Sequence, residues 1–202
     1  MNKIVKKCQF SEKVFYLEVE APLIARSCKP GNFIIIRVDE KSERVPYTIA
    51  KSDAERGILS LVVQEVGLSS TKLCRLNEGD YVHDIVGPLG TPSKIDNYGT
   101  VICAGGGIGI AAILPILTAL KQAGNRIISI LAGRTKELVI MVDDVKKYSD
   151  EVIVMTFFNQ RYEFCRFFLE CRIGQLSFLV LVLKLFEFFF ICRDIGQLFI
   201  HI

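Results

Sequence analysis

Four glycines within five positions form the part of this sequence that is best suited to hold a ligand: Gly105, Gly106, Gly107 and Gly109. Glycine allows positive φ and lets a ligand approach the main chain closely. A helix that begins here would offer unpaired N–H groups and a positive dipole end, which suit a phosphate. The pattern predicts a dinucleotide-binding turn, although Ile110 stands where the full G-x-G-x-x-G fingerprint has glycine. A turn that only packs a strand on a helix is the alternative.

The residues on either side of these glycines predict the elements that would position them. The apolar run 100–104 predicts a strand, and 108–122 predicts a helix that stops at Gly124. A strand at 126–132, a helix at 136–148 and a strand at 151–156 follow. This β-α-β-α-β order is typical of an open parallel sheet.

The first hundred residues have a different pattern, in which short β-branched or alternating apolar runs are separated by turn residues. They predict about six strands and one short helix, which suggests a small antiparallel barrel. Pro46 lies inside one of the runs and favours an edge strand or an irregular strand there. The expected strands are two within 3–20 and one each at 33–38, 44–50, 58–64 and 81–86, with the helix at 69–76.

The predicted fold class is therefore a two-domain α+β protein. An antiparallel β-barrel occupies residues 1–97, and an incomplete α/β Rossmann-like domain occupies 98–156. An atypical tail, 157–202, contains eleven of the fourteen phenylalanines and none of the six prolines.

Composition excludes several functions. The net charge of +3 is spread along the 202 residues without a basic patch that contains aromatics, so nucleic-acid binding is not indicated. Seven cysteines in no paired spacing favour a reducing compartment over a disulfide framework. Residues 1–10 contain lysines but no apolar signal-peptide region. We therefore expect a cytoplasmic protein.

The order of a barrel and a glycine-rich parallel domain resembles the ferredoxin–NADP reductase superfamily. The segment 44–48, Arg-Val-Pro-Tyr-Thr, is similar to that family's Arg-x-x-Tyr-Ser/Thr flavin motif, and 67–71 is similar to its FAD pyrophosphate turn. The segments 87–90 and 103–115 resemble one branch of the superfamily. That branch contains the electron-transfer subunit of dihydroorotate dehydrogenase and the small subunit of NADH-dependent ferredoxin–NADP oxidoreductase.

The resemblance implies that the first domain binds FAD. Tyr47 would stack on the flavin, Thr48 would hydrogen-bond near its N5 atom, and Arg44 would neutralise the pyrophosphate. A core tyrosine, a surface arginine and a simple helix cap at 69–71 are the alternatives. The residues that the resemblance assigns to FAD are Arg44, Pro46, Tyr47, Thr48, Gln64, Gly67, Ser69, Ser70 and Thr71.

The resemblance also implies that the glycine turn receives a nicotinamide dinucleotide. Arg134, at the end of the next strand, suits a 2′-phosphate and slightly favours NADP over NAD, although an exposed turn arginine is as good an interpretation. The implied reaction is hydride transfer from NAD(P)H to FAD, followed by electron release to a larger catalytic redox subunit. No acid/base pair is required, and we expect His83 to be structural.

The sequence departs from this branch after Thr156. Residues 157–161 replace the Asp-Gly-Ser-x-Gly-like loop of the branch. The family also implies a [2Fe–2S] centre, but Cys165, Cys171 and Cys192 do not have its spacing, and we find no ligand set or other metal site.

Three interpretations of the tail stay open. The first is a membrane segment at 176–191, which is disfavoured because it is short and contains Lys184 and Glu187. The second is a divergent final α/β unit. The third is a reading frame shifted near codon 157, which would make the chain a truncated, non-catalytic flavin-binding fragment.

Overall fold

The computed structural model describes residues 1–156 and 179–182. These residues belong to two compact units, one of Met1–Lys94 with Ala111–Ile116 and one of Ile95–Ile110 with the chain from Leu117 on. The predictions about the loop at 157–161, the three tail cysteines and most of the segment 176–191 lie outside the described residues.

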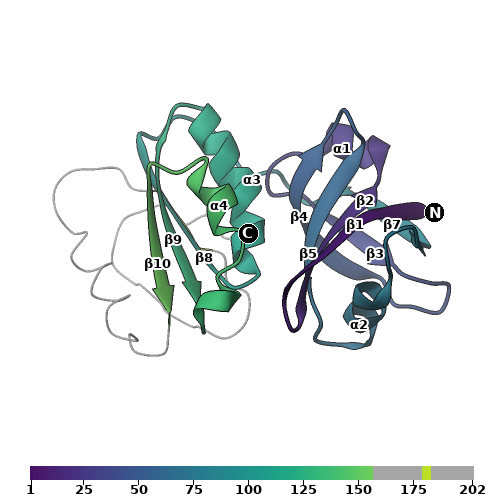
Figure 1. The fold of residues 1–202 in the computed structure, drawn as a ribbon. Coiled ribbons are helices and arrows are strands. Elements are labelled where there is room, and N and C mark those ends of the chain that lie inside the picture. The colour runs from purple at the N-terminus through teal and green to yellow at the C-terminus, as the bar shows by residue number, and fades with distance from the viewer. Residues whose placement is uncertain (157–178, 183–202) are drawn as a thin grey trace. The chain divides into compact units, whose positions relative to one another are not determined.

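The first unit is built on seven antiparallel strands and two short helices (Figure 1). Alternation of buried and exposed side chains along the strands places one face of the sheet in the core. The elements are β1 (Asn2–Ser11), β2 (Val14–Glu20), α1 (Pro22–Ser27), β3 (Phe33–Arg37), β4 (Val45–Asp53), β5 (Ile58–Gln64), α2 (Leu68–Arg75), β6 (Tyr81–Val82) and β7 (Asp84–Leu89).

The sheet order β6-β1-β2-β5-β4-β3-β7 curls the first unit into a nearly closed barrel. Its two outer strands, β6 and β7, are separated in the sequence only by His83. The backbone N–H of His83 donates to the Val38 carbonyl oxygen at 3.0 Å. The chain therefore passes from one end of the sheet directly to the other.

The core of the barrel is aliphatic. Ile4, Leu17, Ile34, Leu59 and Leu61 are fully buried within it. Burial of aliphatic side chains of this size contributes about 1.5–3 kcal/mol each. This core fixes the strands that carry the candidate site.

The second unit has a four-stranded parallel sheet of order β10-β9-β8-β11. The barrel followed by this parallel α/β portion confirms the predicted fold class. No helix within 1–156, or in the short described stretch after it, is long and apolar enough to cross a membrane. The elements are β8 (Thr100–Gly106), α3 (Gly109–Gln122), β9 (Arg126–Gly133), the 3₁₀ turn η1 (Lys136–Leu138), α4 (Val142–Lys146), β10 (Glu151–Thr156) and β11 (Leu179–Val182).

Two predicted elements were wrong in detail. The expected strand 81–86 is two strands, since β6 pairs with β1 and β7 pairs with β3. The expected helix 136–148 is only η1 and the five-residue α4. The helix is interrupted between them, where Met141 adopts a left-handed φ of 54° that a right-handed helix does not contain.

Candidate functional site

The candidate flavin residues of β4 alternate between the surface and the core. Pro46 and Thr48 are exposed, whereas Tyr47 between them is half-buried. The register aligns Tyr47 with Ile34 of the neighbouring strand β3, a fully buried core residue. Pro46 and Thr48 therefore present their side chains outward, where a ligand can reach them.

Strand β4 changes its pairing partner along its length, and none of its residues is paired on both sides by the described strands. It pairs with β3 from Val45 to Thr48, but its pairing with β5 begins at Ile49. Pro46 therefore lies on a locally open edge, as predicted for a strand proline. The exposed Gln64, at the end of β5, lies beyond this paired region as well.

Tyr47 is held more firmly by the barrel than the sequence suggested. Its ring packs against the aliphatic core, and its hydroxyl group is buried without a hydrogen-bond partner. Burial is the main cause that raises the pKa of Tyr47 to about 12, and the electrostatic effect of the nearby Cys74 of α2 is the second cause. The phenol is therefore neutral at physiological pH, and its hydroxyl lies inside the barrel.

Arg44 stands immediately before β4 and is half exposed. Its Nη2 donates to Oδ2 of Asp84, the first residue of β7, at 3.1 Å. Sequence analysis did not identify Asp84, because 40 residues separate it from Arg44. The carboxylate holds one edge of the guanidinium and leaves its remaining donors for an anion.

The first turn of α2 carries the second group of candidate residues. Gly67 precedes the helix, and Ser70 Oγ accepts hydrogen bonds from the N–H groups of Gly67 and Val66 at 3.0 and 3.1 Å. The helix-cap interpretation therefore holds for Ser70. Ser69 is buried and Thr71 is half-buried, and the first-turn N–H groups of any helix lack intrahelical acceptors.

Sequence analysis missed two apolar side chains beside this turn. Val66 and Leu68, on either side of Gly67, are 74% and 77% exposed. A Cβ atom added at Gly67 would meet nothing within 4 Å. The approach to the helix start is therefore open and partly apolar.

An ion pair joins α2 to the β3–β4 loop, which we define as residues 38–44. Lys72 Nζ donates to Asp39 Oδ2 at 2.9 Å and to Ser42 Oγ at 3.2 Å. The structure thus brings α2 against the chain that leads into Arg44. Asp39, Ser42 and Lys72 gave no signal in the sequence beyond a polar connection.

The carboxyl group of Asp39 has a lowered pKa. Hydrogen bonds from Lys72 and then Ser42 lower its pKa from 3.8 to about 2. A depressed folded-state pKa contributes stability that is present above pH 3.8 and is lost as pH falls toward 2. In Lys72→Met we expect the pKa of Asp39 to return toward 3.8, as measured by carboxyl-carbon NMR titration. An unchanged pKa would contradict the assignment of this ion pair.

The predicted nucleotide turn lies between β8 and α3 in the second unit. Gly107 has φ +54°, and its N–H donates to the Ala132 carbonyl oxygen of β9 at 2.9 Å. Gly105 and Gly109 are buried, whereas Gly106 is exposed. The hydrogen bond attaches the turn to β9. The buried glycines pack within the unit, and the backbone at Gly106 stays accessible.

The strand order places this turn at a topological switch point. Strands β9 and β10 lie on one side of β8, and β11 lies on the other. Ligands of open parallel sheets bind outside the carboxyl ends of strands where the order reverses. Arg134, exposed directly after β9, also lies at a carboxyl strand end.

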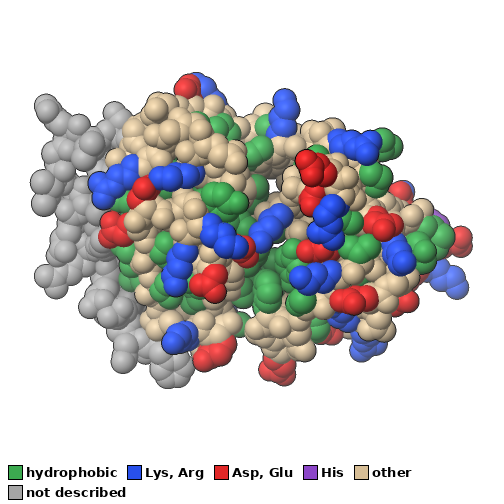
Figure 2. Space-filling model, turned by 45° about the horizontal axis from the view of Figure 1, so that its top comes forward, with side chains coloured by type: hydrophobic (Ala, Val, Ile, Leu, Met, Phe, Trp, Pro, Cys, Tyr) green, Lys and Arg blue, Asp and Glu red, His purple; other side chains and the backbone are tan. Residues whose placement is uncertain are grey.

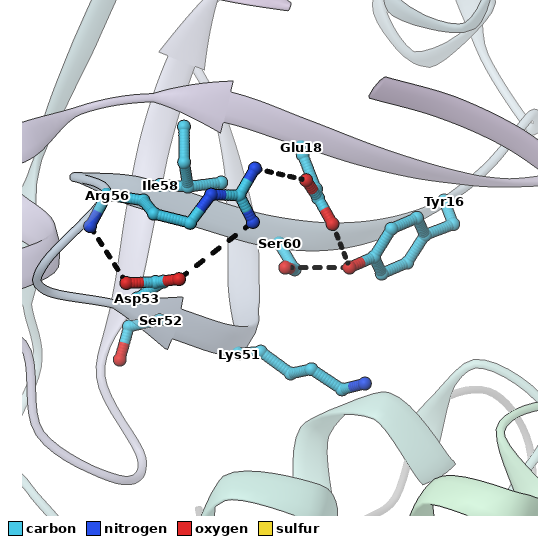
Figure 3. A pocket seen from close by; sticks show the side chains of 8 residues that line it. All are labelled: Tyr16, Glu18, Lys51, Ser52, Asp53, Arg56, Ile58 and Ser60. Carbon is cyan, nitrogen blue, oxygen red and sulfur yellow. Dashed lines mark hydrogen bonds and ion pairs between the residues drawn. The ribbon is translucent and has the colours of Figure 1, made fainter. Parts of the chain in front are cut away.

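A separate pocket of about 230 Å³ lies on the barrel and contains none of the predicted flavin residues (Figure 3). Tyr16 bridges Glu18 and Ser60 with hydrogen bonds of 2.9 Å. Arg56 pairs loosely with Glu18 at 3.7 Å and with Asp53 at 3.9 Å. The acidic and basic groups of this pocket therefore compensate one another.

The described residues contain no group of three or more His, Cys, Asp or Glu side chains that could hold a metal ion. On the face shown in Figure 2, Lys and Arg side chains are interspersed with Asp and Glu. Neither arrangement suggests metal chemistry or a nucleic-acid surface for the described residues.

Comparison with known proteins identifies the barrel. Residues 2–93 match the family model for the oxidoreductase FAD-binding domain. The barrel of this chain therefore matches the FAD-binding domain family over its whole length. The match covers all seven strands of the FAD-binding domain, with α2 and the β3–β4 loop.

Two similar proteins support the predicted branch of the superfamily. The "dihydroorotate dehydrogenase B (NAD(+)), electron transfer subunit homolog" of Thermotoga maritima is 46% identical over 154 residues, which cover 76% of this chain and 55% of that protein. A solved structure of NADH-dependent reduced ferredoxin-NADP oxidoreductase is also 46% identical, with a TM-score of 0.73, and the match covers 76% of this chain and 56% of that one. The predicted resemblance is confirmed, and the chain spans little more than half the length of these relatives.

A more distant structure shows the same fold. Phthalate dioxygenase reductase has a TM-score of 0.74 at 18% identity, and the match covers 89% of this chain and 59% of that one. At this identity the likeness concerns the architecture alone. A β-barrel followed by a parallel α/β portion is the shared arrangement.

Proposed function

We propose that this chain is a flavoprotein electron-transfer subunit that passes electrons from NAD(P)H through FAD to a larger catalytic redox partner. The observation that carries the proposal is that a barrel matching the FAD-binding family holds Arg44, Thr48 and the first turn of α2 around one core. The predicted cytoplasmic location is part of this proposal.

The residues of the barrel fit FAD. The free donors of Arg44 and the first-turn N–H groups of α2 suit the pyrophosphate. The exposed Thr48 offers a hydrogen bond at the open edge of β4. When bound, FAD supplies the redox chemistry, since it exchanges both electron pairs and single electrons.

The second unit would present the nicotinamide dinucleotide. The backbone at Gly106 and Gly107 is open to a close approach by the pyrophosphate, and α3 begins directly after it. Arg134 would contact a 2′-phosphate and so favour NADP. No side chain of these residues needs to exchange a proton in the reaction.

Anaerobic titration of the FAD-reconstituted protein tests this proposal. Loss of the visible flavin absorbance on addition of NADPH or NADH is the expected result. A stronger response to NADPH that disappears in Arg134→Ala would support the role of this arginine. A protein that does not take up FAD would contradict the proposal.

A second candidate is a non-catalytic flavin-binding fragment. It is favoured by one observation, namely that the match to the FAD-binding family model is confined to residues 2–93 and does not include the second unit. Stable FAD binding without reduction by either nicotinamide would select this alternative. Re-sequencing of the coding DNA across codons 150 to 202 would show whether another frame restores the missing motifs.

A further inference from the structure

The β3–β4 loop is folded around Asp39. Its Oδ1 accepts the Lys41 N–H at 2.9 Å, and its carbonyl oxygen accepts the Ser42 N–H at 3.1 Å. The remaining carboxylate oxygen, Oδ2, accepts from Lys72 at 2.9 Å. One residue thus shapes the turn and attaches it to α2.

Lys72 lies one helical turn after Leu68 and Ser69, at the start of α2. It therefore joins the helix end predicted to hold an anion to the loop that ends in Arg44. The Lys72 side chain is 37% exposed, so most of its surface is covered by the protein.

We propose that Lys72 is a positioning residue for flavin binding. By holding Asp39 and Ser42, it fixes the β3–β4 loop against α2. The loop in turn fixes Arg44 relative to the first-turn N–H groups, so that both anion-binding elements are in place before FAD arrives. The inference rests on the proposed function, and it concerns a residue outside the predicted flavin set.

The physical basis is preorganisation. A loop that must be ordered during binding reduces affinity, because its conformational entropy is lost at that step. A loop already held by two hydrogen bonds avoids this cost. Asp84 adds to the same effect, since it restrains the Arg44 side chain from β7.

The test compares FAD affinity in variants of the full chain by flavin fluorescence titration. Lys72→Met is expected to raise the Kd for FAD about threefold to fivefold, the range for a partly exposed ion pair. Lys72→Arg should restore most of the affinity, because it keeps the charge and a donor. In an Asp39→Asn background, Lys72→Met should have little further effect.

Lys121→Met is the matched control. Lys121 has the same 37% side-chain exposure and forms an ion pair with Asp150 at 2.7 Å in the second unit. Loss of this ion pair in Lys121→Met should lower the free energy of unfolding by about as much as Lys72→Met does. The Kd for FAD should stay unchanged.

Three outcomes separate the hypotheses. A wild-type protein that does not bind FAD refutes the proposed function itself. Wild-type binding with an equal Kd in Lys72→Met refutes only the positioning role. An undiminished effect of Lys72→Met in the Asp39→Asn background also refutes it, because Lys72 would then act without Asp39.

Discussion

Arg44→Ala is expected to weaken FAD binding by about 30-fold, which corresponds to the loss of a charge-assisted contact of about 2 kcal/mol. The guanidinium provides a planar fork of donors, and Asp84 occupies only one edge of it. Arg44→Lys should recover part of the affinity, since it restores the charge but not the fork. Isothermal titration calorimetry with FAD would measure both variants.

The control for this experiment is Arg26→Ala, which removes an exposed arginine from the last turn of α1. Its FAD affinity should equal that of the wild type. The free energy of unfolding without FAD should change little in Arg44→Ala, because surface ion pairs contribute about 0–1 kcal/mol. A large loss of stability in Arg44→Ala would mean that the residue supports the fold and not the cofactor.

Gly57→Ala is expected to destabilise the barrel by about 3 kcal/mol. Gly57 closes the connection between β4 and β5 with φ +69°, where an L-residue costs about 1–2 kcal/mol. An added Cβ would also lie 2.8 Å from Pro22 Cβ and 3.0 Å from Pro22 Cα, and overpacking of this kind costs about 1–3 kcal/mol. Urea unfolding monitored by circular dichroism would measure the change.

Gly79→Ala separates the two causes. Gly79 has φ +96°, but an added Cβ would meet nothing within 4 Å. This variant should therefore show the cost of backbone strain alone, about 1–2 kcal/mol. Equal destabilisation of both variants would show that the Pro22 contact contributes nothing.

The strands of the barrel were predictable because alternation and β-branched runs are local signals. The division of 81–86 into β6 and β7 was not predictable, because the residues on both sides of His83 favour a strand. The two strands differ only in their partners, since β6 pairs with β1 and β7 pairs with β3. Helix α1 was missed because six residues give little periodicity, although Pro22 at its first turn was an available signal.

For the candidate site, the residues of β4 and α2 were predicted from motifs that are continuous in the sequence. Their supports, Asp84 and Lys72, lie 40 and 33 residues from the groups they hold, and no local pattern marks such pairs. The inward packing of Tyr47 followed from the core around it, which the sequence of one strand does not specify.

The one-sided pairing of β4 before Ile49 makes the cofactor a potential structural component of the barrel. Backbone groups beside Pro46 have β3 as their ladder partner and face no strand on the other side. A ligand bound along this edge would complete the set of interactions that a neighbouring strand supplies elsewhere. By thermodynamic linkage, a ligand at 100 times its Kd adds about 2.7 kcal/mol to the free energy of unfolding. The melting temperature of this chain would then report the FAD concentration around it.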